Sequence, residues 1–182
     1  KTTEKSLSEQ EKWISIFNGV DLENWEVKIK GHPLGENWNN TFTVVNSAIR
    51  VDYSEYKTFD NSFGHIFYKT PYSNYRFKMT YRFLGNQMEG GENWALRNSG
   101  VMIHCQSPES MELDQNFPVC IEVQLLGGVS KNKARSTANL CTPGTNVVMD
   151  GKLFKRHCTS SNSPSFRGDQ WVTVEVEVRG NE

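Results

Sequence analysis

Two short strand-like segments carry polar side chains whose types suit proton transfer. They are residues 99–105 (SGVMIHC) and residues 119–125 (VCIEVQL). Side chains alternate between the two faces of a strand, so Glu122 and Gln124 share one face of the second segment. If the segments pair as neighbours, His104 of the first can reach the same surface. A carboxylate and an imidazole placed together can act as general base and general acid, so Glu122 and His104 are predicted to be catalytic.

The same side chains allow other interpretations. His104 and Glu122, with or without Gln124, also offer nitrogen and oxygen donors to a divalent metal ion. Alternatively, Glu122 forms a structural ion pair with an arginine such as Arg97, and His104 is a satisfied histidine of the core. The residue types alone leave these alternatives open.

Strands must position these residues. From Tyr75 to Phe83 the odd positions are apolar and the even positions are polar, which predicts a half-buried antiparallel strand. In residues 171–178 four valines alternate with Trp, Thr and Glu, and two more strands are expected on either side of Asn46 and Ser47. Residues 127–169 are interpreted as largely irregular. Short strands separated by turns, without a long amphipathic helix, predict an all-β antiparallel sandwich.

Length and composition narrow the class of protein. The chain has 182 residues, and we expect a flexible leader of residues 1–11 followed by a single domain of residues 12–182. The net charge is −1 with scattered charges, which argues against nucleic acid or an anionic membrane surface as a partner. No apolar run reaches the roughly 18 residues of a membrane span. The first residue, Lys1, is compatible with a processed export precursor.

Four cysteines divide into two pairs. Cys141 and Cys158 lie in turn-rich polar sequence, and a disulfide between them is expected; the alternative is two free thiols. That disulfide would indicate an oxidising compartment. Cys105 and Cys120 fall on opposite faces of the paired segments, so they are predicted to be unbridged.

An ordered set of motifs resembles the 3-keto-disaccharide hydrolase family. The motifs are FNGVDLENW, GHIFY, YRFKMTYRF, RNSGVMIH, IEVQLLGG and GDQWVTVEVEVRG. The resemblance covers roughly residues 12 to 182 and implies a concanavalin-like jelly roll, exported to the periplasm or cell surface of glycan-degrading bacteria. Family domains commonly continue with a further pair of strands, so the expectation is either that the last strands of the jelly roll are missing after Glu182 or that the sheet is completed differently.

The resemblance also implies a chemistry. Family members cleave glycosides whose sugar carries a ketone at C3, which acidifies the proton on C2. A base such as Glu122 can remove that proton, and the group on C1 then leaves, with His104 as base or acid. A separate sugar 3-dehydrogenase would supply the ketone. The candidate substrate-binding residues come from the strand ends and loops: Arg97, Asn98, Ser99, Gln124, Gln106, His65, Trp94 and Trp38.

Two other functions remain as alternatives. The first is a lectin-like module that binds carbohydrate through Trp and Asn side chains without turnover. The second is a conventional glycoside hydrolase, which needs a second carboxylate about 5–10 Å from Glu122. The strand sequences offer no such carboxylate on the same face. The motifs of serine hydrolases, zincins and nucleotide-binding enzymes are also absent from the sequence.

Overall fold

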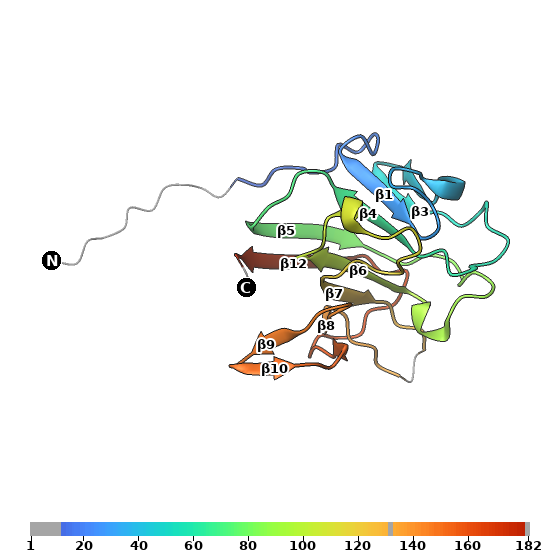
Figure 1. The fold of residues 1–182 in the computed structure, drawn as a ribbon. Helices are drawn as coiled ribbons and strands as arrows, with labels where there is room; N and C mark the ends of the chain where they lie inside the picture. Colours follow the sequence, from blue (N-terminus) through green and yellow to red (C-terminus); the bar gives the residue numbers. More distant parts are fainter. Residues whose placement is uncertain (1–11, 131–132, 181–182) are drawn as a thin grey trace.

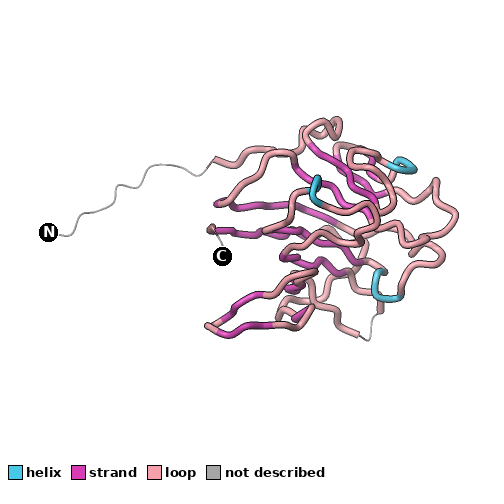
Figure 2. Tube along the Cα trace, viewed as in Figure 1, coloured by secondary structure: helices cyan, strands magenta, loops and turns pink. Residues whose placement is uncertain are grey.

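The computed structural model describes residues 12–130 and 133–180, so the expected leader, residues 1–11, lies outside the described residues. Short antiparallel strands make up this part of the chain, with 3-10 turns as its only helical elements (Figures 1 and 2). The strands are β1 (Trp25–Ile29), β2 (Phe42–Val45), β3 (Ala48–Val51), β4 (Gly64–Tyr68), β5 (Asn74–Tyr81), β6 (Asn98–Ile103), β7 (Ile121–Leu126), β8 (Asn139–Cys141), β9 (Val147–Met149), β10 (Lys152–Phe154), β11 (Cys158–Thr159) and β12 (Val172–Arg179). The 3-10 turns are η1 (Trp38–Asn40), η2 (Asn93–Ala95) and η3 (Pro108–Ser110).

Every strand pairs in the antiparallel sense. The longest ladder joins β5 to β12, which lie side by side in Figure 1. A four-stranded sheet has the order β11-β8-β7-β6. The remaining pairs are β1 with β4, β2 with β3, and β9 with β10. The predicted all-β antiparallel sandwich is therefore confirmed. Residues 127–169 are largely irregular, as expected, but they also contain four short strands that were not predicted, β8 to β11.

The core forms between the β5–β12 pair and the β6–β7 pair. Val174, Val176 and Val178 are buried together with Leu125 of β7. Val101 and Val123 are among the partly buried side chains that pack against this cluster. The valine alternation read from the sequence thus identifies the inner face of β12, and the odd-numbered residues of β7 face the core.

A second apolar cluster lies under the first strands of the chain. It contains Val27, Ile29 and Phe42. Lys28 is also buried, and its ammonium group donates hydrogen bonds to the backbone oxygens of Ile29, His32 and Leu113, at 3.1, 2.9 and 3.0 Å. The bond to Leu113 ties the loop between β6 and β7 to β1.

Within the described ranges, no helix is long and apolar enough to cross a membrane.

Candidate active site

Glu122 lies near the start of β7, on the sheet face opposite the core. The predicted pairing of the two segments is confirmed: Met102 of β6 and Cys141 of β8 are its partners across the ladder. The side chain is partly buried, and it forms no hydrogen bond or ion pair with any residue that the structure describes. Burial raises the pKa of Glu122 to about 7. An unpaired carboxyl group with a pKa near neutrality has the properties of a general base.

Gly100 makes room for this carboxylate. It lies on β6, diagonally across from Glu122, and a Cβ atom there would collide with Oε1 of Glu122. The same Cβ would lie 2.5 Å from Cγ and 2.8 Å from Cδ of Glu122, well inside van der Waals contact. The glycine is therefore required by the position of the Glu122 side chain.

Replacing Gly100 by alanine is expected to destabilise the fold by about 1–3 kcal/mol through overpacking, and to lower activity by displacing Glu122. Urea denaturation of Gly100→Ala, of Glu122→Ala and of the double variant measures the change in unfolding free energy. Because Glu122→Ala removes the colliding atoms, Gly100→Ala should cost less than about 0.5 kcal/mol in that background. An equal cost in both backgrounds would show that the Glu122 side chain is not the obstacle.

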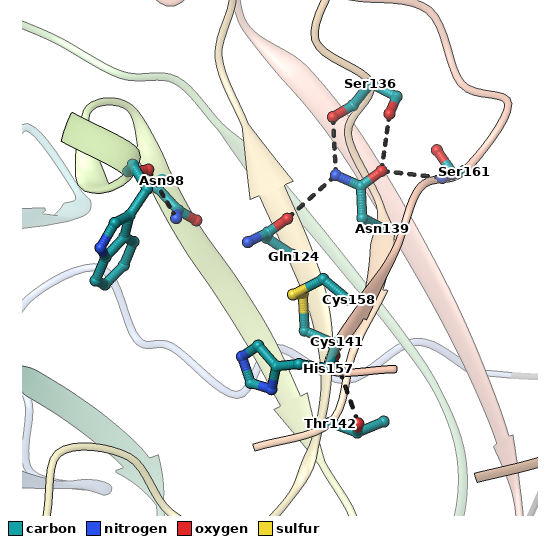
Figure 3. The surroundings of a disulfide bond; sticks show 10 residues. Asn98, Gln124, Ser136, Asn139, Cys141, Thr142, His157, Cys158 and Ser161 are labelled. Atoms are coloured by element: carbon teal, nitrogen blue, oxygen red, sulfur yellow. Dashed lines mark hydrogen bonds between the residues drawn. A yellow bond between two sulfur atoms is a disulfide. The ribbon is translucent and has the colours of Figure 1, made fainter. Parts of the chain in front are cut away.

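Gln124 shares the Glu122 face and is held from the next strand. Its side-chain oxygen accepts a hydrogen bond of 3.2 Å from Nδ2 of Asn139, its ladder partner on β8 (Figure 3). Asn139 is 5% exposed and is held by Ser136 and Ser161. Sequence analysis did not identify Asn139, because its contact with Gln124 depends on pairing between β7 and β8.

His104 lies just beyond the end of β6, and the ladder does not bring it beside Glu122. The φ angle of His104 is 50°. The next backbone hydrogen bond, from Gln106 N to Val119 O, is shifted by one residue from the register of the β6–β7 ladder. This β-bulge interrupts the strict alternation that the prediction for His104 assumed. The imidazole is exposed and has no hydrogen bond to the part of the chain that the structure describes. The catalytic role of His104 stays a prediction.

The bulge also changes the relation between the two free cysteines. Cys105 and Cys120 are unbridged, as expected, but the reason given was wrong. Their thiols interact with one another instead of lying on opposite faces. A hydrogen bond from Cys120 lowers the pKa of Cys105, and this contact together with burial raises the pKa of Cys120.

The three candidates before and at the start of β6 have different surroundings. The guanidinium of Arg97 donates to the backbone oxygen of Gly128 at 2.6 Å and packs against Gly168, so it is not the ion-pair partner of Glu122. Asn98 donates from Nδ2 to the backbone oxygen of Trp94, at 3.1 Å, and alternation places it on the Glu122 face. Ser99 is exposed and has the opposite parity. Of the three, Asn98 is the one whose position suits the predicted site.

Gln106 and His65 hold the loop between β6 and β7. Oε1 of Gln106 accepts hydrogen bonds from Val119 N and from Gln115 Nε2, at 2.6 and 2.8 Å. Nε2 of His65 bonds the backbone oxygen of Asn116 at 2.8 Å, and burial lowers the pKa of His65. Both side chains therefore make structural contacts to this loop, and their predicted contact with substrate is not tested.

The two candidate tryptophans are exposed and stacked. The ring of Trp94 is 6.1 Å from that of Phe63, with an angle of 12° between the planes. The ring of Trp38 lies 4.3 Å from the imidazole of His32. The two residues are 50% and 41% exposed, respectively. Each ring leaves surface that a sugar could cover, which keeps the predicted stacking role open.

The expected disulfide is confirmed and lies beside Glu122. Cys141 and Cys158 are bonded, with an S–S distance of 2.08 Å, and Cys141 is the ladder partner of Glu122. His157 is exposed and is drawn near the disulfide in Figure 3. Sequence analysis gave His157 no role, because residues 141 and 158 become neighbours of β7 only in the folded chain.

Arg135 holds the backbone before the start of β6 and just after the end of β7, and it was not predicted from the sequence. Its guanidinium donates to the backbone oxygens of Leu96, Gly127 and Trp94, at 2.5, 3.1 and 3.0 Å. Arg135 also lines a cavity of about 330 Å³ that Trp94 borders. A larger cavity of about 450 Å³ lies over β5 and β12, with Trp13 on its border, and Glu122 does not line it. No local sequence signal marks Arg135, since its partners lie 8 to 41 residues away.

The metal prediction finds no support in the arrangement of the donors. Among residues 12–130 and 133–180, no group of three or more His, Cys, Asp or Glu side chains could hold a metal ion. Gln124 directs its oxygen at Asn139 rather than into the open face. We derive no step through a metal, and ligation of a metal ion by His104 and Glu122 stays a prediction.

Fold and site together define a β-sandwich protein with a partly buried carboxyl group, unpaired among the described residues, on the sheet face opposite the core. The chain belongs to the 3-keto-alpha-glucoside-1,2-lyase-like domain family, whose profile matches residues 12–182. The family resemblance of the sequence motifs is confirmed by this match. Comparisons with curated proteins and with solved structures gave no significant match.

Proposed function

We propose that this protein cleaves 3-keto-glycosides and that Glu122 is the base that removes the proton from C2. The family description supports the class of substrate. The observation that carries the proposal is the partly buried Glu122 carboxyl, which has no partner in the described ranges and a pKa of about 7. At that pKa a large fraction is ionised at neutral pH, and the carboxylate is still basic enough to accept a proton from carbon.

The proposed reaction is an elimination. The Glu122 carboxylate takes the C2 proton, and the C–H electron pair forms an enolate with the C3 carbonyl. The C3 carbonyl then re-forms, a C1–C2 double bond is made, and the C1–O bond to the leaving group breaks. An acid, assigned to His104, protonates the leaving oxygen. Water can add to the unsaturated ketone afterwards, which would make the overall reaction a hydrolysis. A single carboxylate is enough for this route, in contrast to conventional glycosidases.

Other proposed assignments follow from the same chemistry. The substrate would contact Asn98 and Gln124 on the sheet face, with Arg97, Ser99, Gln106, His65, Trp94 and Trp38 around it. A separate sugar 3-dehydrogenase would supply the ketone. Export to the periplasm or cell surface is proposed as well, and the Cys141–Cys158 disulfide supports an oxidising compartment.

The direct test compares a 3-keto-glucoside with the matching unoxidised glucoside. We expect aglycone release from the keto sugar alone. With a nitrophenyl leaving group, which needs little protonation by an acid, kcat/KM should rise with pH to a plateau, with its midpoint near the Glu122 pKa of about 7. Cleavage of the unoxidised glucoside would favour a conventional hydrolase. Sugar binding without product over long incubation would favour a lectin-like module. Loss of turnover in EDTA, and its return when a divalent ion is added, would indicate that cleavage needs a metal ion.

The identity of the acid is tested by two matched histidine variants. His104→Ala is expected to lower kcat by about 10²-fold for poor leaving groups and much less for nitrophenolate, which needs little protonation. His157→Ala is the comparison, since His157 is the exposed histidine beside the disulfide. If His157→Ala shows this leaving-group dependence and His104→Ala does not, the assignment moves to His157.

A further inference from the structure

We infer that Gln124 presents its amide N–H₂ group, and not its oxygen, to the open face beside Glu122, and that Asn139 fixes this orientation. The inference rests on the proposed function for its substrate: the acceptor would be the C3 oxygen of a keto sugar. Gln124 would then be a catalytic donor, and Asn139 a positioning residue that acts through it.

The orientation of the Asn139 amide is fixed by backbone groups. Its Oδ1 accepts a hydrogen bond of 3.0 Å from the backbone N–H of Ser161. Its Nδ2 donates to the backbone oxygen of Ser136 at 3.1 Å. A backbone N–H can only donate and a backbone carbonyl can only accept, so the reversed amide would lose both bonds.

The orientation of Gln124 follows from that of Asn139. Since Nδ2 of Asn139 is a donor, the Gln124 atom 3.2 Å away must be the acceptor oxygen. Its Nε2 lies on the opposite side of the amide, turned away from Asn139 (Figure 3). In the part of the chain that the structure describes, this nitrogen has no hydrogen-bond partner. Two N–H donors are therefore free on the face that carries Glu122.

A second layer of hydrogen bonds lies behind Asn139. Ser161 Oγ donates to the backbone oxygen of Thr137 at 2.6 Å, and Ser163 Oγ does the same at 2.6 Å. Thr137 and Asn139 are both about 5% exposed. A buried network of this kind holds the amide in one orientation before the substrate arrives, which is the requirement for electrostatic stabilisation of a transition state.

A fixed donor suits the proposed chemistry. The C3 oxygen is a carbonyl in the substrate and gains negative charge as the C2 proton leaves, and hydrogen bonds to charged acceptors are the stronger ones. Removal of a comparable oxyanion donor in other enzymes costs about 10²–10³-fold in kcat. Gln124 therefore contributes mainly to kcat, with a smaller effect on substrate binding.

Gln124→Glu and Asn139→Asp test the two roles. Gln124→Glu keeps the shape but removes the donor, and we expect kcat to fall about 10²-fold or more with KM changed less than about tenfold. Asn139→Asp keeps an acceptor for Ser161 N–H, but Gln124 must then turn its Nε2 toward the new carboxylate and present its oxygen to the site. A similar fall in kcat in a folded protein is expected. Unchanged kcat in either variant overturns the inference. Gln170→Glu, an exposed loop variant, is the control.

A binding measurement separates this inference from the proposed function. In Glu122→Gln protein, the Gln124 side-chain amide resonance is identified by its loss on Gln124→Glu. We expect this resonance to shift when a 3-keto-glucoside is added, while that of Asn139 stays in place. No shift in the presence of bound sugar overturns the inference. Failure of the wild-type protein to cleave the keto sugar overturns only the proposed elimination, since the resonance still reports which atom of Gln124 meets the ligand.

Discussion

Glu122→Gln is expected to reduce cleavage of a 3-keto-glucoside by about 10²–10⁴-fold, the range typical of a lost general base. Glutamine has the size and shape of glutamate but cannot accept the C2 proton. The loss should appear in kcat and in kcat/KM alike, because the proton is transferred in the transition state. Release of the aglycone at pH 8, followed over a range of substrate concentrations up to saturation, measures both constants.

The same substitution is expected to stabilise the fold. The folded-state pKa of Glu122, about 7, lies above its ordinary value of 4.5, so the folded protein binds this proton more tightly than the unfolded chain. Stability contributed by the group is therefore present at low pH and is lost as pH rises from about 4.5 through 7. Each pKa unit corresponds to about 1.4 kcal/mol, and partial exposure reduces the total to about 1–3 kcal/mol.

The measurement compares urea unfolding of wild type and Glu122→Gln at pH 5 and at pH 8. Between pH 5 and pH 8, the unfolding free energy of the variant should rise by about 1–3 kcal/mol relative to that of wild type. Glu177→Gln is the matched control, because Glu177 is exposed on β12 and far from the candidate site in the fold. Full activity of Glu122→Gln would refute Glu122 as the base. If the stability of this variant relative to wild type does not change with pH, the pKa of Glu122 is not raised.

Loss of the Cys141–Cys158 disulfide is the second large effect, expected to cost about 3 kcal/mol of unfolding free energy. The bond joins residues 17 apart in the sequence and ties β11 to β8, the strand next to Glu122. Without it, the unfolded chain gains freedom that folding must remove. The double variant Cys141→Ser/Cys158→Ser, unfolded in urea beside wild type, measures the change.

Cys105→Ser is the control for the disulfide, since Cys105 is a free thiol. It should change the unfolding free energy by about 1 kcal/mol or less. Dithiothreitol should lower the unfolding midpoint of wild type and leave that of the double variant unchanged. If the reductant leaves the wild-type midpoint in place under conditions that break the bond, the disulfide does not stabilise the fold.

Much of the fold could be predicted because strand alternation is a local property. Successive side chains point to opposite faces whatever the partner strand is, so the buried valines of β12 and the shared face of Glu122 and Gln124 followed from parity alone. The β2–β3 hairpin followed from its turn residues, since Asn46 and Ser47 adopt the positive φ values that such a turn requires.

The sequence by itself determined the all-β class, the family and the candidate base. Only the tertiary structure decided what surrounds that base. The bulge at His104 lies where the loop between β6 and β7 meets the ladder, and Arg97 turns to Gly128 instead of Glu122. The raised pKa of Glu122 and the fixed amide of Gln124 come from burial and from Asn139 on another strand. Burial and hydrogen bonding between strands depend on which segments meet in space. The local pattern of residues does not determine which segments become neighbours.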